Sequence, residues 1–206
     1  MGYRRAVDVL EDLPAVFTSA DACRVLGSKR VQTRTYLARW RRAGHVESLG
    51  TTGIHFNLVV DPAGRDARIG EALMRLSPAA VLVGASALFR HGWLSDPPTA
   101  LDVALPRRKD YPDVPGVALH PRSAKWFEIV LGHTEIGESR MPELAPGYAL
   151  VDILAQEGLS MPPLGHVDIP DEEIDVLLEA ADAFGVERFL VERHIERYIP
   201  GDAPRP

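Results

Sequence analysis

Cysteine and long apolar runs are almost missing from this sequence. Its 206 residues include one cysteine, Cys23, which excludes an internal disulfide framework and indicates a reducing compartment. No apolar stretch approaches the roughly 18 residues of a membrane-spanning helix, and the first residues lack the apolar segment of a signal peptide. We therefore expect a cytoplasmic protein that makes no membrane contact.

The residue patterns of common cofactor and metal sites are also missing. No two of the seven histidines lie three or four residues apart, and no glycine-rich phosphate cradle is present. Gly84-Ala85-Ser86 resembles the opening of a nucleotidyltransferase, but the following strand, Asp102-Val103-Ala104, lacks the second carboxylate that two metal ions require. Ser86 does not fit a hydrolase nucleophile either, because the sharp strand-to-helix turn that carries such a serine needs a glycine two residues later, where this sequence has Leu88. We expect no metal, no cofactor and no enzymatic activity, with Asp102 at the sheet surface.

The charge of the chain is strongly uneven. Although the net charge is -6, the segment from Ala22 to Val46 holds seven Lys or Arg and no acidic residue. Residues 1–60 carry nine basic and five acidic residues, a balance of +4, and residues 61–206 carry fourteen and twenty-four, a balance of -10. A basic segment in an acidic protein indicates a surface that binds a polyanion, and the asymmetry indicates two functional halves.

The basic segment has the pattern of a helix-turn-helix. Thr18 or Ser19 can cap a first helix over residues 21–26, and Ser28 can cap a second helix over residues 29–43. A glycine follows each helix, which suits the left-handed conformation at helix ends.

Apolar residues form one stripe on the second helix. Thr33, Tyr36, Leu37 and Trp40 recur at helical spacing and are expected to face a core. The other faces carry arginine, glutamine and threonine, which contact guanine and adenine edges and phosphates in DNA. Together with two residues of the following hairpin, the predicted DNA-binding residues are Lys29, Arg30, Gln32, Arg34, Thr35, Arg39, Arg42, Thr52 and His55.

A β-hairpin is predicted to follow this helix. Residues 45–50 form its first strand and residues 51–53 its turn; in the second strand, residues 54–58, apolar and polar side chains alternate and His55 faces outward. A first helix is predicted over residues 4–13. A helix-turn-helix followed by a hairpin predicts a winged helix that binds double-stranded DNA, and an ordinary small helical domain with a basic surface is the alternative.

The remainder of the chain predicts an α+β domain. A turn-rich segment from Asp61 to Gly64 separates it from the first, which gives domains of residues 1–62 and 63–206. The predicted fold class is therefore α+β, with an N-terminal winged helix-turn-helix and a C-terminal mixed α/β domain. The expected elements are helices at 66–76, 149–156, 171–184 and 186–198, a buried apolar segment at 79–93, and strands at 100–105, 117–120, 128–131 and 134–136.

The order of several short motifs resembles one protein family. Arg42-Ala43-Gly44-His45-Val46 closes the second helix, and residues 83–93 with Pro97-Pro98 precede the strand at 101–105. The run from Pro142 to Leu154 is similar to the segment before the helix that closes the family's central sheet. In this order the motifs resemble the AbiEi-type antitoxins of abortive-infection, or type IV toxin-antitoxin, operons, over most of residues 5–156.

The resemblance implies a function for each half. The family's N-terminal domain binds DNA and represses its own operon, and its C-terminal domain antagonises a nucleotidyltransferase toxin without a stable toxin complex. Two copies are expected on one DNA operator, because paired domains read half-sites. Two alternatives stay open: a winged-helix regulator whose C-terminal half senses a small molecule, and a degenerate nucleotidyltransferase-like domain that serves as a protein-binding scaffold.

Overall fold

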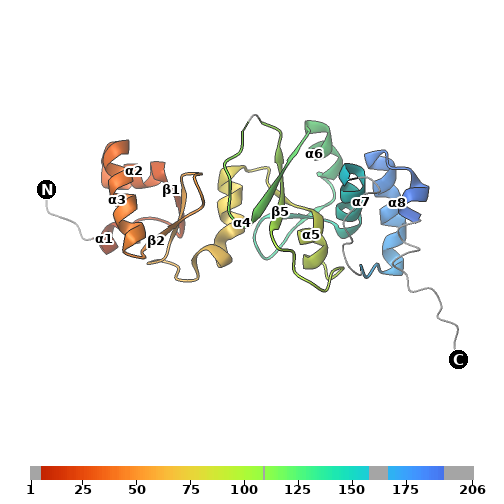
Figure 1. Cartoon of the computed structure of the whole chain (residues 1–206), viewed down its shortest axis with the longest axis horizontal. Coiled ribbons are helices and arrows are strands. Elements are labelled where there is room, and N and C mark those ends of the chain that lie inside the picture. The colour runs from red at the N-terminus through yellow and green to blue at the C-terminus, as the bar shows by residue number, and fades with distance from the viewer. Residues whose placement is uncertain (1–5, 109, 158–166, 193–206) are drawn as a thin grey trace, which may run out of the picture. The chain divides into compact units, whose positions relative to one another are not determined.

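The computed structural model describes residues 6–108, 110–157 and 167–192, which divide into two compact units (Figure 1). Unit 1 contains the residues up to Ala79 together with 110–115 and 138–141, and unit 2 contains the others. Each unit combines helices with a sheet, so the protein is of the α+β class. Among the described residues, none of the helices has the length and apolar character needed to cross a membrane.

Unit 1 is built on an antiparallel sheet with the strand order β1-β3-β2. The predicted helices and both hairpin strands are present, and β1 is an additional strand. In chain order the elements are α1 (Ala6–Glu11), β1 (Val16–Thr18), α2 (Ser19–Leu26), α3 (Arg30–Arg42), β2 (Val46–Ser48), β3 (Ile54–Asn57) and α4 (Gly64–Leu76).

The two helices of the basic segment begin in different ways. Thr18 caps α2 as predicted: its hydroxyl accepts a hydrogen bond from the backbone N of Asp21 at 3.1 Å, and the Asp21 carboxylate accepts one from the backbone N of Thr18 at 2.9 Å. The predicted cap at Ser28 is wrong, because α3 begins one residue later and Lys29 takes the cap position. The Ser28 hydroxyl instead lies 2.8 Å from the hydroxyl of Thr33.

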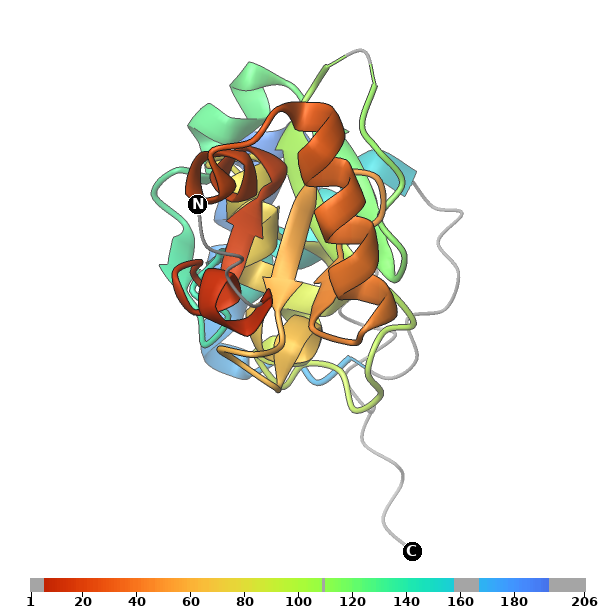
Figure 2. The same cartoon turned by 90° about the vertical axis from the view of Figure 1, so that its left-hand side faces the viewer.

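Strand β3 is buried on both faces. Phe17 pairs with His55 and belongs to the core of α1–α3, so His55 and Asn57 face these helices. Ile54 and Phe56 point to the opposite face, where α4 packs on β3. Figure 2 shows these layers, with α3 in the foreground and α4 behind the strands. The predicted alternation of buried and exposed side chains in this strand is therefore wrong.

Helix α4 packs with unit 1. It contacts β3 and β1, and Ala72 and Leu73 are fully buried. A side chain at Gly70 would collide with the backbone of Ser139, because the segment 138–141 packs closely against the helix. The first continuous segment of unit 1 thus ends at Ala79, and the domain boundary predicted after Pro62 lies inside this unit.

Unit 2 is built on a mixed sheet with the strand order β6-β5-β4-β8-β7. Strand β4 pairs antiparallel with β5 and parallel with β8, β5 pairs parallel with β6, and β7 pairs antiparallel with β8. In chain order the elements are β4 (Val81–Leu82), α5 (Gly84–Arg90), β5 (Leu101–Pro106), β6 (Val117–Arg122), α6 (Ala124–Val130), β7 (Thr134–Ile136), β8 (Pro142–Leu144), α7 (Pro146–Glu157), the short 3-10 helix η2 (Asp171–Glu173) and α8 (Ile174–Phe184).

Two predicted elements of unit 2 differ from the structure. The strand predicted at 128–131 is wrong, because Ser123 caps a helix there by accepting a hydrogen bond from the backbone N of Trp126 at 3.2 Å. The apolar segment 79–93 contains strand β4 and helix α5. Of the helix predicted at 186–198, residues 188–192 are helical and the residues after 192 lie outside the described part of the chain.

A buried ion pair links β6, α6 and α7 in unit 2. An Nη atom of Arg122 lies 2.9 Å from Asp152, and the two side chains are 12% and 1% exposed. The indole Nε1 of Trp126 donates to the other carboxylate oxygen of Asp152 at 2.7 Å. Because a buried carboxylate is costly without partners, these two donors make Asp152 compatible with the core.

Candidate nucleic-acid interface

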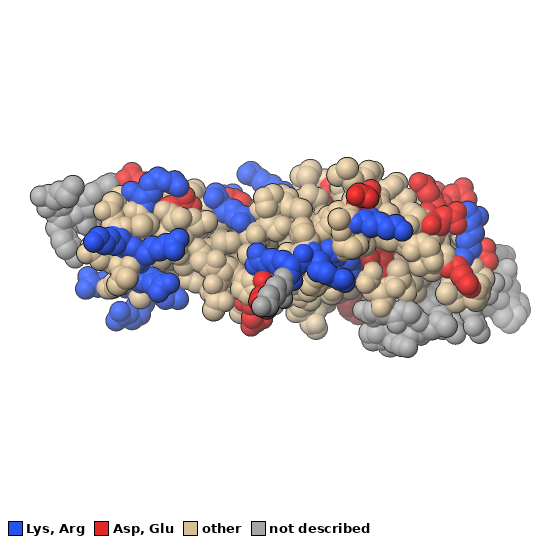
Figure 3. Space-filling model, turned by 90° about the horizontal axis from the view of Figure 1, so that it is seen from above, with Lys and Arg blue, Asp and Glu red and all other residues tan. Residues whose placement is uncertain are grey.

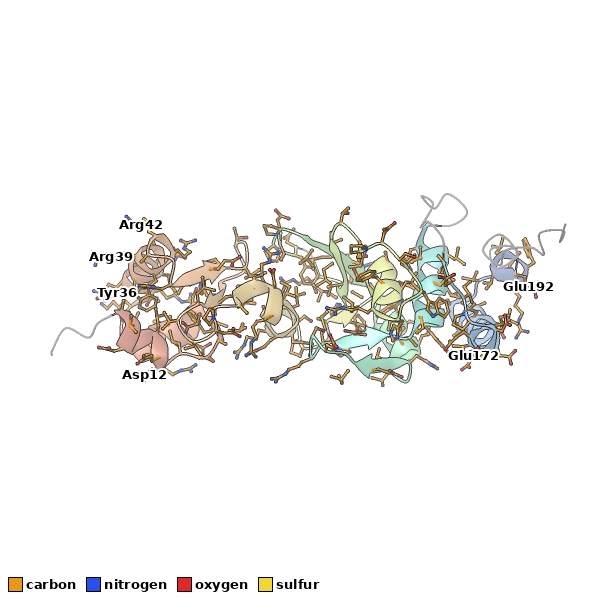
Figure 4. The ribbon with its side chains drawn as sticks, turned by 90° about the horizontal axis from the view of Figure 1, so that it is seen from below. Asp12, Tyr36, Arg39, Arg42, Glu172 and Glu192 are labelled. Carbon is orange, nitrogen blue, oxygen red and sulfur yellow. The ribbon has the colours of Figure 1, made fainter. Side chains whose placement is uncertain are left out.

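Helix α3 has one buried edge. Thr33, Leu37 and Trp40 are only 2%, 3% and 4% exposed. Tyr36, which was predicted on the same edge, is 37% exposed, and its ring centre lies 6.2 Å from that of Trp40. It sits at the rim of the stripe, so the buried edge is narrower than predicted. Figure 4 shows Tyr36, Arg39 and Arg42 projecting outward from the helix.

The other residues of α3 are exposed, except Ala38, which is half-buried. Basic side chains gather over this part of unit 1 in the space-filling view (Figure 3). The structure exposes every residue of this segment that was predicted to contact DNA, namely Lys29, Arg30, Gln32, Arg34, Thr35, Arg39 and Arg42. The exposure of these seven residues agrees with the prediction, and Arg41, which was not among them, is exposed as well.

The arginines of α3 form no ion pair with a described carboxylate of the protein. Elsewhere in unit 1 arginines are paired, as Arg68 is with Asp61 at 2.7 Å. In the part of the chain that the structure describes, a carboxylate pairs with none of Arg30, Arg34, Arg39, Arg41 and Arg42. Like charges one helical turn apart repel by a few tenths of a kcal/mol per pair, so a bound polyanion would stabilise this helix.

A groove of about 450 Å³ lies between α2 and α3. Arg24 from α2 and Arg30 and Arg34 from α3 line it, together with Ser19 at the start of α2. Arginine binds phosphate through two parallel hydrogen bonds, so this flank of α3 suits the DNA backbone. Sequence reasoning counted Arg24 in the basic segment but did not place it at the site; the spacing of the two helices is what brings it there.

The turn between β2 and β3 uses Thr52 internally. The Thr52 hydroxyl donates to the carbonyl oxygen of Leu49 at 2.7 Å and accepts from the backbone N of Ile54 at 3.1 Å. Gly50 has a φ of 53°, and a side chain there would collide with the backbone of Asp113. The turn is therefore held from within and covered in part by the segment 110–115.

His55 is not available to DNA. It is 6% exposed, and its Nε2 and Nδ1 atoms each lie 2.9 Å from a serine hydroxyl, on Ser19 and Ser48 respectively. The prediction that it faces outward is wrong, because both faces of β3 are covered. Burial, with a smaller effect of the positive charge of Arg41, lowers the pKa of His55 to about 4. The neutral imidazole joins the start of α2 to the hairpin.

A hydrogen-bonded cluster in unit 2 contains Ser86, Asp102 and His120. The Asp102 carboxylate accepts from the backbone N of Ser86 at 3.3 Å and from its hydroxyl at 3.2 Å, and its other oxygen lies 2.9 Å from Nε2 of His120. Asp102 is 19% exposed, so its expected place at the sheet surface is corrected: it holds the first turn of α5 against β5. A nucleophilic triad needs the imidazole between serine and carboxylate, and here the carboxylate stands between the other two.

Unit 2 has open pockets, but its described residues form no cluster of metal ligands. Two pockets of about 400 and 280 Å³ include Arg90 and Lys125, respectively, in their linings. Ala104, at the position of the absent second carboxylate, is fully buried in the sheet. Across the described ranges, no three His, Cys, Asp or Glu side chains gather as ligands for a metal ion.

Comparisons with known proteins bear on the fold. No family model and no curated protein matches the sequence. Among solved structures, the chain is similar to the crystal structure of the RV2827C protein from Mycobacterium tuberculosis, with a TM-score of 0.55 and 20% sequence identity. The match covers 90% of this chain and 69% of that chain. At this identity the likeness shows a shared fold over most of the sequence.

Proposed function

We propose that unit 1 binds double-stranded DNA and that the protein represses transcription from the site it binds. The observation that carries the proposal is the exposed surface of α3, which combines arginine, glutamine and threonine and pairs with no carboxylate of the described ranges. The element order α1-β1-α2-α3-β2-β3, with strands arranged β1-β3-β2, is typical of winged helix-turn-helix domains. It supports the placement of α3 in the major groove, where such a helix presents side chains to base edges.

The exposed residues of α3 have different roles in this proposal. Gln32 and Arg39 lie beside the outward midline of the helix and contact base edges, since Gln pairs with adenine and Arg with guanine. Arg30 and Arg34 line the groove beside α2 and bind phosphates, with Lys29 at the start of the helix. Affinity then comes mainly from phosphate neutralisation, which makes binding steeply salt-dependent.

We further propose, from the resemblance to AbiEi-type antitoxins, that the operator lies in the protein's own operon and that unit 2 antagonises a nucleotidyltransferase toxin. Two copies occupy one operator, each reading a half-site. The charge of unit 2 supports the assignment of DNA binding to unit 1 alone, because acidic residues gather over α8 (Figure 3). Residues 171–182 contain six Asp or Glu and no Lys or Arg, and such a surface repels DNA.

The test of DNA binding uses the full-length protein and duplexes enriched by it from a random pool. Replacing Arg34 and Arg39 together with alanine is expected to weaken binding to the enriched duplex by about 1–3 kcal/mol per contact, measured by fluorescence anisotropy. The matched control is Arg75→Ala with Arg188→Ala, which removes the same charge from arginines outside α3 that pair with carboxylates. An unchanged affinity in the Arg34/Arg39 variant contradicts the proposal.

The antitoxin role has a separate test. The proposal requires a gene for a nucleotidyltransferase beside that of this protein; that enzyme is expressed together with the protein, and growth is compared with and without the Arg34/Arg39 double substitution. The doubly substituted protein is expected to lose operator repression but to rescue growth, because unit 2 is unchanged. Rescue that disappears together with DNA binding contradicts the assignment of toxin antagonism to unit 2.

A further inference from the structure

The face of α3 directly opposite its buried edge is largely uncharged. Four residues of this face lie one above the other along the helix, about half a turn away from the buried edge at 100° per residue. They are spaced i, i+4, i+7 and i+11 and are Val31, Thr35, Ala38 and Arg42. The arginines and glutamine of the helix lie on either side of this line, apart from Arg42 at its end. A bound duplex would therefore meet an apolar or small surface first at the midline, and charged groups at the flanks.

Val31 is the exposed apolar group at the start of this line. Its side chain is 75% exposed although it belongs to the first turn of a helix with a packed opposite edge. A single exposed valine on an ordinary surface needs no explanation. This one lies where a helix that enters the major groove places its base-contacting residues, which are those of the first turns.

Thr35 adds a second methyl group to the same place. Its hydroxyl donates back along the helix to the carbonyl oxygen of Val31 at 3.4 Å. With the hydroxyl turned inward in this way, the methyl group is the outer part of the side chain. Val31 and Thr35 together thus form a small exposed apolar surface at the N-terminal end of α3.

The major groove offers one apolar group that fits such a surface, the C5 methyl of thymine. We propose that Val31, together with the methyl of Thr35, is a specificity-determining residue that selects thymine in the operator through this methyl group. The inference rests on the proposed DNA binding of unit 1. It adds a contact that depends on shape and apolar burial, distinct from the hydrogen bonds of Gln32 and Arg39.

The test replaces thymines of the enriched duplex one at a time with deoxyuridine, which pairs identically with adenine and lacks only the methyl group. For the wild-type protein, one or two replacements per half-site are expected to weaken binding about fourfold, the factor for burial of one methyl-sized group. Val31→Ala is expected to weaken binding to the thymine duplex by a similar factor and to be insensitive to those replacements. Alanine favours the helix, so this variant keeps its fold.

The control is Val60→Ala, which shortens another exposed valine of unit 1, one outside α3 that is 46% exposed. It is expected to keep both the wild-type affinity and the sensitivity to deoxyuridine. A duplex that is enriched and bound but shows no sensitivity to any replacement, or a Val31→Ala protein that keeps the sensitivity, overturns the role of Val31. Failure to enrich any duplex overturns the proposed DNA binding itself, so the two failures are distinct.

Discussion

The buried imidazole of His55 makes the stability of unit 1 depend on pH in a defined window. Burial, with a smaller effect of Arg41, lowers its pKa from 6.5 to about 4 in the folded protein. In the unfolded chain the imidazole regains its ordinary pKa, so between these values the unfolded state binds the additional proton. The contribution of His55 to stability is therefore complete above about pH 6.5, falls as the pH decreases toward 4, and decreases no further below that.

The size of the effect follows from the shift in pKa. One pKa unit corresponds to about 1.4 kcal/mol, so a decrease from 6.5 to about 4 amounts to roughly 3 kcal/mol. This is a large fraction of the 5–15 kcal/mol by which domains are typically stable, about a fifth to more than a half. We expect unit 1 to lose stability at roughly 1.4 kcal/mol per pH unit across the window.

Urea unfolding of the full-length protein between about pH 7 and 4.5, followed by NMR signals of unit 1, measures this slope. In His55→Gln the side chain can still hydrogen-bond a serine hydroxyl but no longer titrates, so the slope is expected to flatten. Asp21→Asn is the control: the hydrogen bond from the Thr18 backbone lowers the pKa of this carboxyl below 3.8, so its contribution is lost only at lower pH. Equal slopes in wild type and His55→Gln would refute the reasoning.

Three further substitutions test the packing. Trp40→Ala is expected to destabilise unit 1 by about 3–5 kcal/mol in urea unfolding, and an unchanged midpoint would show that the buried edge of α3 is assigned incorrectly. Asp152→Ala leaves Arg122 and the indole of Trp126 without their acceptor and is expected to cost unit 2 about 3–5 kcal/mol, whereas Asp152→Asn costs less. Gly50→Ala forces a side chain into a positive φ and a close backbone contact, so we expect a loss above about 1 kcal/mol in thermal unfolding.

The sequence predicted α3 well because local signals are strong there. The spacing of Leu37 and Trp40 defines the buried edge, and the residues between them are then exposed by geometry alone. The strand β1 was missed because three residues, Val16–Thr18, are too short to show alternation. The error at His55 has another cause: the prediction left one face of the hairpin free, whereas α4 covers the face of Ile54 and Phe56, and His55 lies on the face toward α1–α3.

In unit 2 the error at residues 128–131 has a different cause. Trp126, Phe127, Ile129 and Val130 form a short apolar cluster that fits a buried strand and a buried helix equally well. The deciding signal was Ser123, whose hydroxyl caps α6, and a single serine is weak evidence when read alone. The hydrogen bonds between Ser86 and Asp102 were not predicted. The two residues belong to different elements, and a local sequence pattern does not show which residues of separate elements are in contact.

Unit 1 includes residues beyond the domain boundary that was predicted from the sequence. The predicted domain of residues 1–62 ends before α4, yet α4 covers the face of the sheet that carries Ile54 and Phe56. Without this helix both side chains, 4% and 0% exposed in the structure, would face water at a cost of about 1.5–3 kcal/mol each. A fragment limited to residues 1–62 would also lose the segment against Gly50. The integrity of the surface that we propose binds DNA thus depends on residues that lie far along the chain and carry no DNA-binding signal of their own.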